Sequence, residues 1–293
     1  MYKVAKGLKI IRSRFNRQYL SENYKRFPSI LLRYLLFKPG SNVVFCVLFL
    51  LDKYTPFRSA IGRFSGIHKG QTVLILGNGP SLSKVDFDAL KGHVTFASNK
   101  IFLAFSQTSW RPTYYTVEDD LVFSQNAKSI MQVDSEKLFP DLALLHLPSR
   151  CGISFFNYKQ HHHYPYLPRF GNSLYKGIYW GSSVVYTQIQ LAVAMGASRI
   201  ILLGVDFNFD VPKGSLKSTK EIISDGEVNH FHPEYRAVGE KWNIPNLDNQ
   251  RLAFQRAHEY CIRHSIELVN GTRGSKLDVL PKFDFPEFYT RDI

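Results

Sequence analysis

The chain has 293 residues, of which 44% are hydrophobic and 21% charged, the composition of an ordinary globular protein. Its three cysteines, Cys46, Cys151 and Cys261, are far apart and form no C-x-x-C pair, which argues against a disulfide framework or a zinc site and favours a reducing compartment. The net charge of +13 lies almost wholly in residues 1–70, where 14 basic residues stand against two acidic ones, so the remaining chain is not expected to bind nucleic acid.

Residues 1–66 are predicted to form a basic, partly amphipathic helical extension. The first 20 residues carry Lys and Arg throughout and lack the apolar core of a signal peptide. The apolar runs Ile30–Phe37 and Val43–Leu51 are too short to span a bilayer, which takes about 20 residues. We expect them to lie on an anionic membrane surface, which would make the protein cytoplasmic and peripheral at the inner face of the cytoplasmic membrane. Packing against the domain or in a homo-oligomer is the alternative.

The second unit, residues 67–293, is predicted to be one domain in which strands alternate with helices. Short apolar runs bounded by glycine are typical of buried parallel strands. The expected elements are strands at Thr72–Leu76, His93–Ser98, Thr113–Val117, Leu142–Leu147, Arg199–Asp206 and Ile266–Val269, and helices at Ser83–Leu90, Ser182–Ala197 and Asn246–Ser265. This order predicts an α/β fold with a doubly wound, mostly parallel, Rossmann-like sheet and helices on both faces.

Two stretches of this domain show no clear period. Residues 148–180 are rich in aromatic residues, prolines and histidines, and residues 208–230 are mostly polar. We predict that both are lid-like insertions and that most of the second is mobile.

The strongest functional signal is the loop Gly77-Asn78-Gly79-Pro80-Ser81, between the first strand and the helix expected after it. Glycines at such a turn let the backbone approach a phosphate, and the helix start supplies N–H donors and a positive dipole end. Leu82 replaces the third glycine of the dinucleotide fingerprint, and the Gly-Lys-Ser/Thr of a P-loop is absent. A tight turn with Ser81 or Ser83 as helix cap is the simpler alternative. We predict a nucleotide phosphate site.

Polar residues at the ends of other elements are predicted to complete this site. Asn99 ends the second strand, where a doubly wound fold presents a residue to a ribose. Asp206 ends the strand that contains Gly204, whose missing side chain allows close approach of a ligand. Ser182 and Ser183 stand at a helix start, where they can hold an anion or simply cap the helix.

Two further clusters could carry chemistry. His230 and His232 would point the same way on an extended segment, and a histidine suits general-base catalysis at neutral pH, with surface or structural roles as the alternative. The consecutive His161–His163 are expected in a solvated loop. Glu118-Asp119-Asp120 could bind a divalent cation through oxygen ligands. Acidic residues at a strand end or first helical turn also occur without a ligand, so no metal site is predicted.

The run Val73–Leu82, with Asn99 behind it, resembles the opening of bacterial lipooligosaccharide sialyltransferases of glycosyltransferase family 42. The runs Gly181–Phe207 and Asn229–His232 are similar to their second nucleotide-binding segment and to the segment with their catalytic histidine. Over residues 68–285, the chain is still more similar to a group that includes archaeal hydroxymethylpterin diphosphokinases and the motility accessory factors of flagellin glycosylation. Shared features of that group are His68-Lys69-Gly70, Asn229–Pro233 and Pro245–Asp248.

The sialyltransferase resemblance implies transfer of an acidic sugar (sialic acid, Kdo or a related nonulosonate) from a CMP-activated donor to a surface glycan or glycolipid. It implies no required cofactor and a general base at His232, with His230 as the alternate. The nucleotide contacts that it implies are Asn78 and Asn99 at the phosphate and ribose, and Ser182, Ser183, Gly204 and Asp206 on the cytidine side. Asn208 stands where these enzymes have a tyrosine for the leaving phosphate, so lysines of Val211–Lys220 are expected to help there.

Two alternatives to sugar transfer remain open. The diphosphokinase resemblance implies a Mg²⁺-dependent phosphotransferase, in which Asp119, Asp120 and Asp206 would be the metal ligands. The third reading is a non-catalytic nucleotide-binding protein of envelope assembly.

Overall fold

The computed structural model describes residues 61–290, apart from 142, 144–146, 148–151, 161–163, 210–220 and 227. The predictions for the basic extension therefore fall almost entirely outside the described residues, as do those for His161–His163 and for the lysines of Val211–Lys220. Within the part of the chain that is described, no helix combines the length and the apolar character needed to cross a membrane.

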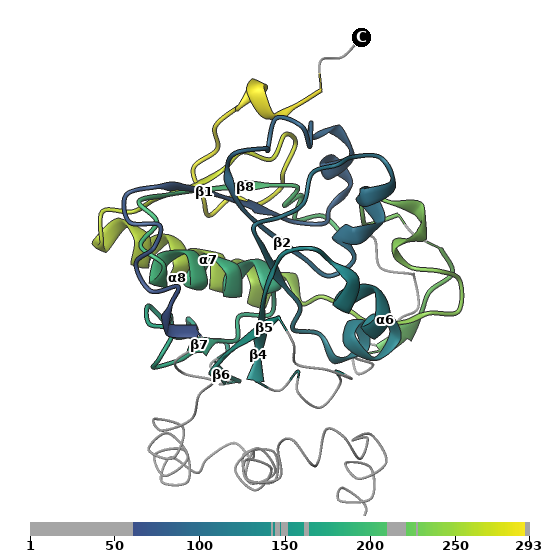
Figure 1. The fold of residues 1–293 in the computed structure, drawn as a ribbon, viewed down its shortest axis with the longest axis horizontal. Coiled ribbons are helices and arrows are strands. Elements are labelled where there is room, and N and C mark those ends of the chain that lie inside the picture. The colour runs from purple at the N-terminus through teal and green to yellow at the C-terminus, as the bar shows by residue number, and fades with distance from the viewer. Residues whose placement is uncertain are drawn as a thin grey trace, which may run out of the picture.

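A seven-stranded parallel sheet forms the centre of the fold (Figure 1). Its strand order is β11-β8-β1-β2-β3-β4-β5, and each neighbouring pair is parallel. The strands are β1 (Thr72–Leu76), β2 (Val94–Ser98), β3 (Tyr114–Thr116), β4 (Glu136–Pro140), β5 (Ile153–Phe156), β8 (Arg199–Leu203) and β11 (Glu267–Asn270). The order runs outward from β1 in both directions, so β1 and β8 flank the switch point. The doubly wound α/β prediction is confirmed.

Each face of the sheet is buried in its own core, which is why the central strands are apolar at most positions. In β1, Val73 and Ile75 pack in the core that includes residues of α7 (Val184–Ala194) and α8 (Leu247–Arg263). Leu74 and Leu76 belong to the opposite core, together with residues of α6 (Asp120–Gln132). Figure 1 shows α7 and α8 lying side by side across one face of the sheet.

Short elements complete the described structure. Two small sheets pair β6 (Tyr158–Lys159) with β7 (Ile178–Tyr179) in parallel, and β9 (Glu221–Ile223) with β10 (Lys241–Asn243) in antiparallel orientation. The 3₁₀ helices are η1 (Pro80–Lys84), η2 (Ile101–Ser106), η4 (Pro233–Tyr235) and η5 (Pro286–Phe288).

The helix predicted at Ser83–Leu90 is wrong. The chain forms η1 instead and leaves it at Val85, whose extended backbone bridges to Tyr289. The Asp86 carboxylate then accepts hydrogen bonds from the N–H groups of Asp88 (2.9 Å) and Ala89 (3.4 Å). This local turn competes with the backbone hydrogen bonds of a helix.

Most of the strand predicted at Leu142–Leu147 lies outside the described residues, and β4 (Glu136–Pro140) comes before it in the chain. The first two residues of β4 are charged, so the sequence pattern did not indicate a buried strand there. In the structure Lys137 is nevertheless buried, and its ammonium group donates to the carbonyl oxygen of Val133. Within the stretch 148–180, residues Ile153–Phe156 form β5, the edge strand of the main sheet. A four-residue strand is too short to show a period.

Candidate functional site

The two predicted glycine-containing segments lie side by side at the carboxyl ends of β1 and β8. The N–H of Gly77 donates to the carbonyl oxygen of Leu203 (2.7 Å), and the N–H of Gly79 donates to that of Gly204 (2.9 Å). Asp206 accepts from Ser81 twice, from the backbone N–H (3.1 Å) and from the hydroxyl (2.7 Å). The structure thus brings the segments 77–81 and 204–206 together at the switch point, where ligands of doubly wound folds bind.

This packing changes what the Gly77–Ser81 loop can offer a phosphate. Three of its N–H groups, those of Gly77, Gly79 and Ser81, already donate to protein oxygens. The element after the loop is a five-residue 3₁₀ helix, whose N-cap residue Gly79 makes no side-chain cap, so the expected α-helix start and its dipole are missing. Neither Ser81 nor Ser83 is its cap. A phosphate here would therefore need donors other than these three N–H groups.

The glycines of the loop are explained by contact with the β8 segment. A Cβ added at Gly77 would overlap the backbone carbonyl of Gly204, and one added at Gly79 would overlap the Asp206 carboxylate. Either methyl group would force the two segments apart.

Gly77→Ala is therefore expected to lower the free energy of unfolding by about 2–3 kcal/mol, the usual cost of overpacking against atoms that cannot move. Denaturant unfolding of the purified protein measures this. Gly92→Ala is the matched control, because Gly92 has open space around its Cβ position and only a positive φ of 84°. That strain alone costs roughly 1 kcal/mol. Equal losses in the two variants would show that the loops are not held in contact.

Asn78 and Asn99 present acceptors at the ends of β1 and β2. The Asn78 amide nitrogen donates to the Ser98 hydroxyl (3.0 Å), and Asn99 adopts a left-handed backbone with φ 51°, which asparagine tolerates. The side-chain oxygens of both residues are buried and find no hydrogen-bond partner among the described residues. An oxygen acceptor pairs with a hydroxyl or amino group but not with a phosphate oxygen. This geometry favours contact with the sugar or base of a nucleotide over contact with its phosphate.

Two buried residues that sequence reasoning missed lie beside these asparagines. Gln188, on α7, donates its amide N–H to the carbonyl oxygen of Ala97 in β2 (2.9 Å). Its own amide oxygen, and the hydroxyl of Thr116 in β3, are likewise buried and unpartnered within the described structure. The only signal in the sequence is a polar residue among the apolar residues of a buried helix.

Ser182 and Ser183 have structural partners at the start of α7. Ser183 is the N-cap, and its hydroxyl accepts from the N–H of Val185 (3.3 Å). Ser182 has a φ of 61°, its hydroxyl lies 3.4 Å from the Tyr164 hydroxyl, and its carbonyl accepts from Gln250 (3.0 Å). These contacts hold the two serines against neighbouring elements. Gly204 and Asp206, by contrast, are bonded to the Gly77–Ser81 loop.

Glu118, at the carboxyl end of β3, is a titratable group for which the sequence analysis predicted no role in proton transfer. One of its oxygens accepts from the hydroxyls of Thr187 on α7 (2.6 Å) and Tyr158 on β6 (2.9 Å). Burial raises the pKa of Glu118 from 4.5 to about 7, although both hydrogen bonds act to lower it, and the neighbouring Asp119 raises it further. A carboxyl group that titrates near neutrality at the ligand edge of the sheet is a candidate for proton transfer.

Two of the three carboxylates named as candidate magnesium ligands, those of Asp119 and Asp206, are engaged with protein donors. Asp119 caps α6 by accepting from the N–H groups of Leu121 (2.7 Å) and Val122 (3.3 Å), and its other oxygen accepts from Asn243 (3.0 Å). Both oxygens of Asp206 accept from Ser81. Among the described residues, no three His, Cys, Asp or Glu side chains form a group that could hold a metal. In this arrangement the proposed ligand set does not fit Mg²⁺.

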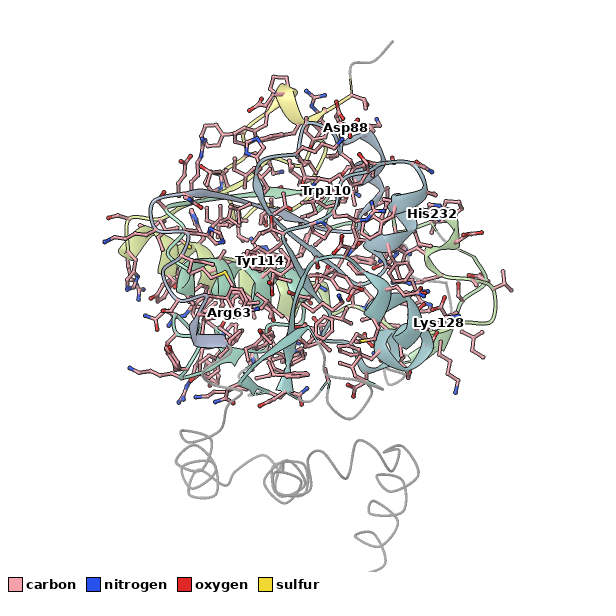
Figure 2. All side chains as sticks on the ribbon, viewed as in Figure 1. Arg63, Asp88, Trp110, Tyr114, Lys128 and His232 are labelled. Atoms are coloured by element: carbon pink, nitrogen blue, oxygen red, sulfur yellow. The ribbon has the colours of Figure 1, made fainter. Side chains whose placement is uncertain are left out.

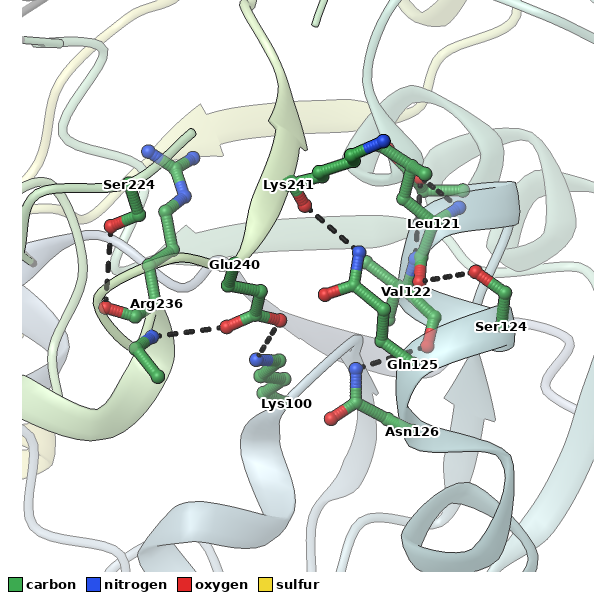
Figure 3. A network of polar contacts seen from close by, with 12 residues as sticks. Lys100, Leu121, Val122, Ser124, Gln125, Asn126, Ser224, Arg236, Glu240 and Lys241 are labelled. Atoms are coloured by element: carbon green, nitrogen blue, oxygen red, sulfur yellow. Dashed lines mark hydrogen bonds and ion pairs between the residues drawn. The ribbon is translucent and has the colours of Figure 1, made fainter. Parts of the chain in front are cut away.

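A covering segment, which we define as residues 221–243, is fastened to the ends of three strands. The N–H of Phe231 donates to the carbonyl oxygen of Asn78 (3.1 Å), after β1. Lys100, after β2, forms an ion pair with Glu240 (2.5 Å), as Figure 3 shows. Near the end of β3, the Gln125 amide donates to the carbonyl oxygen of Lys241 (2.9 Å), also visible in Figure 3. The segment with both candidate catalytic histidines is thus held at the ligand edge.

The two histidines of this segment have different surroundings. The His230 ring stacks face to face on Tyr235, with centroids 3.9 Å apart and planes 3° apart. His232 (Figure 2) is the N-cap of η4, and its Nδ1 accepts from the N–H of Glu234 (3.1 Å). A neutral histidine carries one proton, so Nε2 of His232 holds it in this geometry and acts as a donor. To accept a proton at Nε2, His232 must first give up its cap.

Comparison with known proteins gives one family match. A family model described as 6-hydroxymethylpterin diphosphokinase MptE-like matches residues 50–211, more than half of the chain. No curated protein shows a significant sequence match.

Solved structures with a similar arrangement include a MAf glycosyltransferase from Magnetospirillum magneticum AMB-1, at 12% identity and a TM-score of 0.46. That match covers 83% of this chain but only 42% of the glycosyltransferase. The sialyltransferase CstII from Campylobacter jejuni matches in complex with CMP-3FNeuAc, a substrate analogue, at 14% identity, a TM-score of 0.40 and coverage of 75% and 88% of the two chains. Its complex with cytidine-5'-monophosphate matches at 15% identity, a TM-score of 0.39 and coverage of 76% and 93%.

Proposed function

The chain belongs to the 6-hydroxymethylpterin diphosphokinase MptE-like family, and we propose that it is a nucleotide-dependent transferase whose substrate is a CMP-activated acidic sugar. The sugar, a sialic acid, Kdo or a related nonulosonate, passes to a hydroxyl group of a surface glycan or glycolipid. The donor occupies the carboxyl edge of the sheet, between the glycine loop after β1 and the start of α7.

One observation carries this proposal. The amide oxygens of Asn78 after β1, Asn99 after β2 and Gln188 on α7 are buried and have no hydrogen-bond partner among the described residues. Leaving a buried acceptor without a donor costs about 1–3 kcal/mol. A ligand with several hydroxyl or amino groups would supply the missing donors. The ribose hydroxyls and the cytosine amino group of a CMP-sugar are such donors, whereas its phosphate offers only acceptors.

In the proposed reaction, the acceptor hydroxyl attacks the anomeric carbon of the sugar and loses its proton to a histidine of the covering segment. The bond between the anomeric carbon and the phosphate oxygen breaks, and CMP leaves with that electron pair. A single leaving phosphate needs less charge neutralisation than a diphosphate, so no cofactor is required. A Mg²⁺-dependent diphosphokinase is the alternative that the family description favours, but two of the carboxylates it would use, those of Asp119 and Asp206, are engaged with Ser81, Asn243 and the start of α6.

Thermal unfolding with CMP, UDP, GDP and ATP, each with and without Mg²⁺, tests the proposal. CMP is expected to stabilise the protein without Mg²⁺, by about 2.7 kcal/mol when its concentration is 100 times the dissociation constant. Release of CMP from a CMP-sugar in the presence of an acceptor then establishes transfer. Stabilisation by ATP with Mg²⁺ alone would support the diphosphokinase, and CMP binding without any transfer would support the non-catalytic alternative.

The basic extension is proposed to bring the enzyme to a lipid-linked acceptor. Each basic residue near an anionic membrane surface contributes about 1 kcal/mol, screened by salt. The full-length protein is therefore expected to sediment with phosphatidylserine vesicles at low salt, whereas a chain that begins at Ile67 stays in solution and still binds CMP. If the full-length protein stays in the supernatant, the extension does not bind membranes.

A further inference from the structure

The loop after β11 is fastened by hydrogen bonds to the residues that follow β8. The N–H of Val205 donates to the Thr272 hydroxyl (2.9 Å), and the Ser275 hydroxyl donates to the carbonyl oxygen of Val205 (2.7 Å). The N–H of Lys276 donates to the carbonyl oxygen of Asp206 (2.8 Å). These contacts are buried at Val205, Thr272 and Ser275, so they fix the position of the Lys276 backbone next to Asp206.

The Lys276 ammonium group lies at the rim of the candidate site. Its Nζ donates to the side-chain oxygen of Asn208 (2.9 Å), two residues beyond Asp206. An amide orients the ammonium group but leaves its charge uncompensated, and Lys276 has no ion-pair partner in the part of the chain that is described. By contrast, Lys100, which follows β2, is neutralised by Glu240 at 2.5 Å.

A phosphate at the glycine loop needs a positive charge from outside that loop. The N–H groups of Gly77, Gly79 and Ser81 are occupied, and the Asp206 carboxylate adds negative charge beside them. Phosphate and carboxylate repel each other unless a cation lies nearby. The backbone of Lys276 is bonded to that of Asp206 itself, so Lys276 is the candidate for this positive charge.

We infer that Lys276, oriented by Asn208, binds the phosphate of the nucleotide. This inference rests on the proposed function and assigns the phosphate end of its donor site. When the bond to the sugar breaks, the leaving phosphate takes the electron pair and gains one negative charge. The ammonium group keeps its proton and stabilises that charge electrostatically.

The test compares CMP with cytidine, which lacks the phosphate, by calorimetry on the full-length protein. Lys276→Met is expected to weaken CMP binding roughly tenfold, the scale of one charge-assisted hydrogen bond, and to leave cytidine binding unchanged. Lys276→Arg keeps the charge and retains most of the affinity. Lys128→Met is the control for loss of one positive charge, because Lys128 is an exposed lysine of α6 (Figure 2).

Asn208→Ala gives a second, milder variant at an exposed position that does not endanger folding. It is expected to weaken CMP binding about threefold, because the Lys276 ammonium group loses the hydrogen bond that orients it but keeps its charge. Unchanged CMP affinity in both Lys276→Met and Asn208→Ala, or an equal loss for cytidine and CMP, overturns the phosphate assignment alone. A wild-type protein that binds neither CMP nor cytidine overturns the proposed function.

Discussion

Replacing His232 by asparagine is expected to lower the rate of sugar transfer by about 10²–10⁴-fold, the usual value of a positioned general base. Asparagine is a good N-cap residue, so its side-chain oxygen can take over the hydrogen bond from the N–H of Glu234. The variant therefore removes the proton acceptor and keeps the cap. CMP affinity should stay within about twofold of wild type, because the base contacts the acceptor hydroxyl and not the nucleotide.

Two further variants separate chemistry from structure. His232→Ala removes both the base and the cap, which is worth about 1 kcal/mol of stability. His230→Phe keeps the flat ring that stacks on Tyr235 but cannot accept a proton. The transfer rate is measured for all three variants with CMP-sugar and acceptor at saturation.

The pattern of rates identifies the base. Equal losses in His232→Asn and His232→Ala, with His230→Phe nearly active, place the base at His232. In that case His232 must release its cap during the reaction, at a cost smaller than the benefit of general-base catalysis. Full activity in His232→Asn would reduce His232 to a capping residue, and a loss confined to His230→Phe would move the base to His230. Full activity in every variant would end the case for histidine catalysis.

Glu118→Gln is expected to stabilise the protein at alkaline pH and to have little effect in acid. Burial raises the pKa of Glu118 in the folded protein to about 7, whereas its ordinary value is 4.5. Above pH 4.5 the unfolded chain ionises this carboxyl group, but the folded protein retains the proton until the pH passes about 7. Stability of the wild type therefore falls between these two values. The difference corresponds to about 3 kcal/mol at pH 8, and the neutral glutamine avoids it.

Denaturant unfolding of both proteins from pH 4 to pH 8 measures this effect. The groups that face Glu118 are Tyr158 and Thr187, its hydrogen-bond donors, together with Tyr164 and Asp119. Thr187→Val removes a hydrogen bond that lowers the pKa of Glu118, so it should extend the falling limb to higher pH. If the stability difference between wild type and Glu118→Gln does not change with pH, Glu118 titrates at its ordinary value.

The sequence predicted most of the fold because its central elements carry local signals. β1 and β8 are apolar after their first residue, and α7 and α8 begin after the capping residues Ser183 and Asn246. The failures have different causes. Val85 pairs with the distant Tyr289 instead of continuing a helix, whereas β4 buries a lysine that reads as exposed and that donates to Val133, four residues earlier.

The site was predictable in part for the same reason. Glycines and asparagines after apolar runs mark strand ends, so the approach of the Gly77 and Gly204 segments followed from the expected topology. Other features depend on residues far apart in the chain. Thr187 and Glu118 are 69 positions apart, and Lys276 and Asn208 are 68 apart. No spacing rule links such pairs, and it could not be foreseen that Leu203, Gly204 and Asp206 accept from the loop N–H groups.

The Lys100–Glu240 ion pair constrains how this sequence can change. The side chains are only 8% and 16% exposed, so replacing either one leaves its partner charged and largely out of water. Neutral residues at both positions destabilise the protein far less than a neutral residue at one position, but in evolution the two substitutions arise one at a time. Related sequences should therefore keep both charges or lose both, and intermediates should be rare. Although 140 positions separate them, Lys100 and Glu240 are expected to covary, and a relative that breaks this rule should also have reshaped the covering segment.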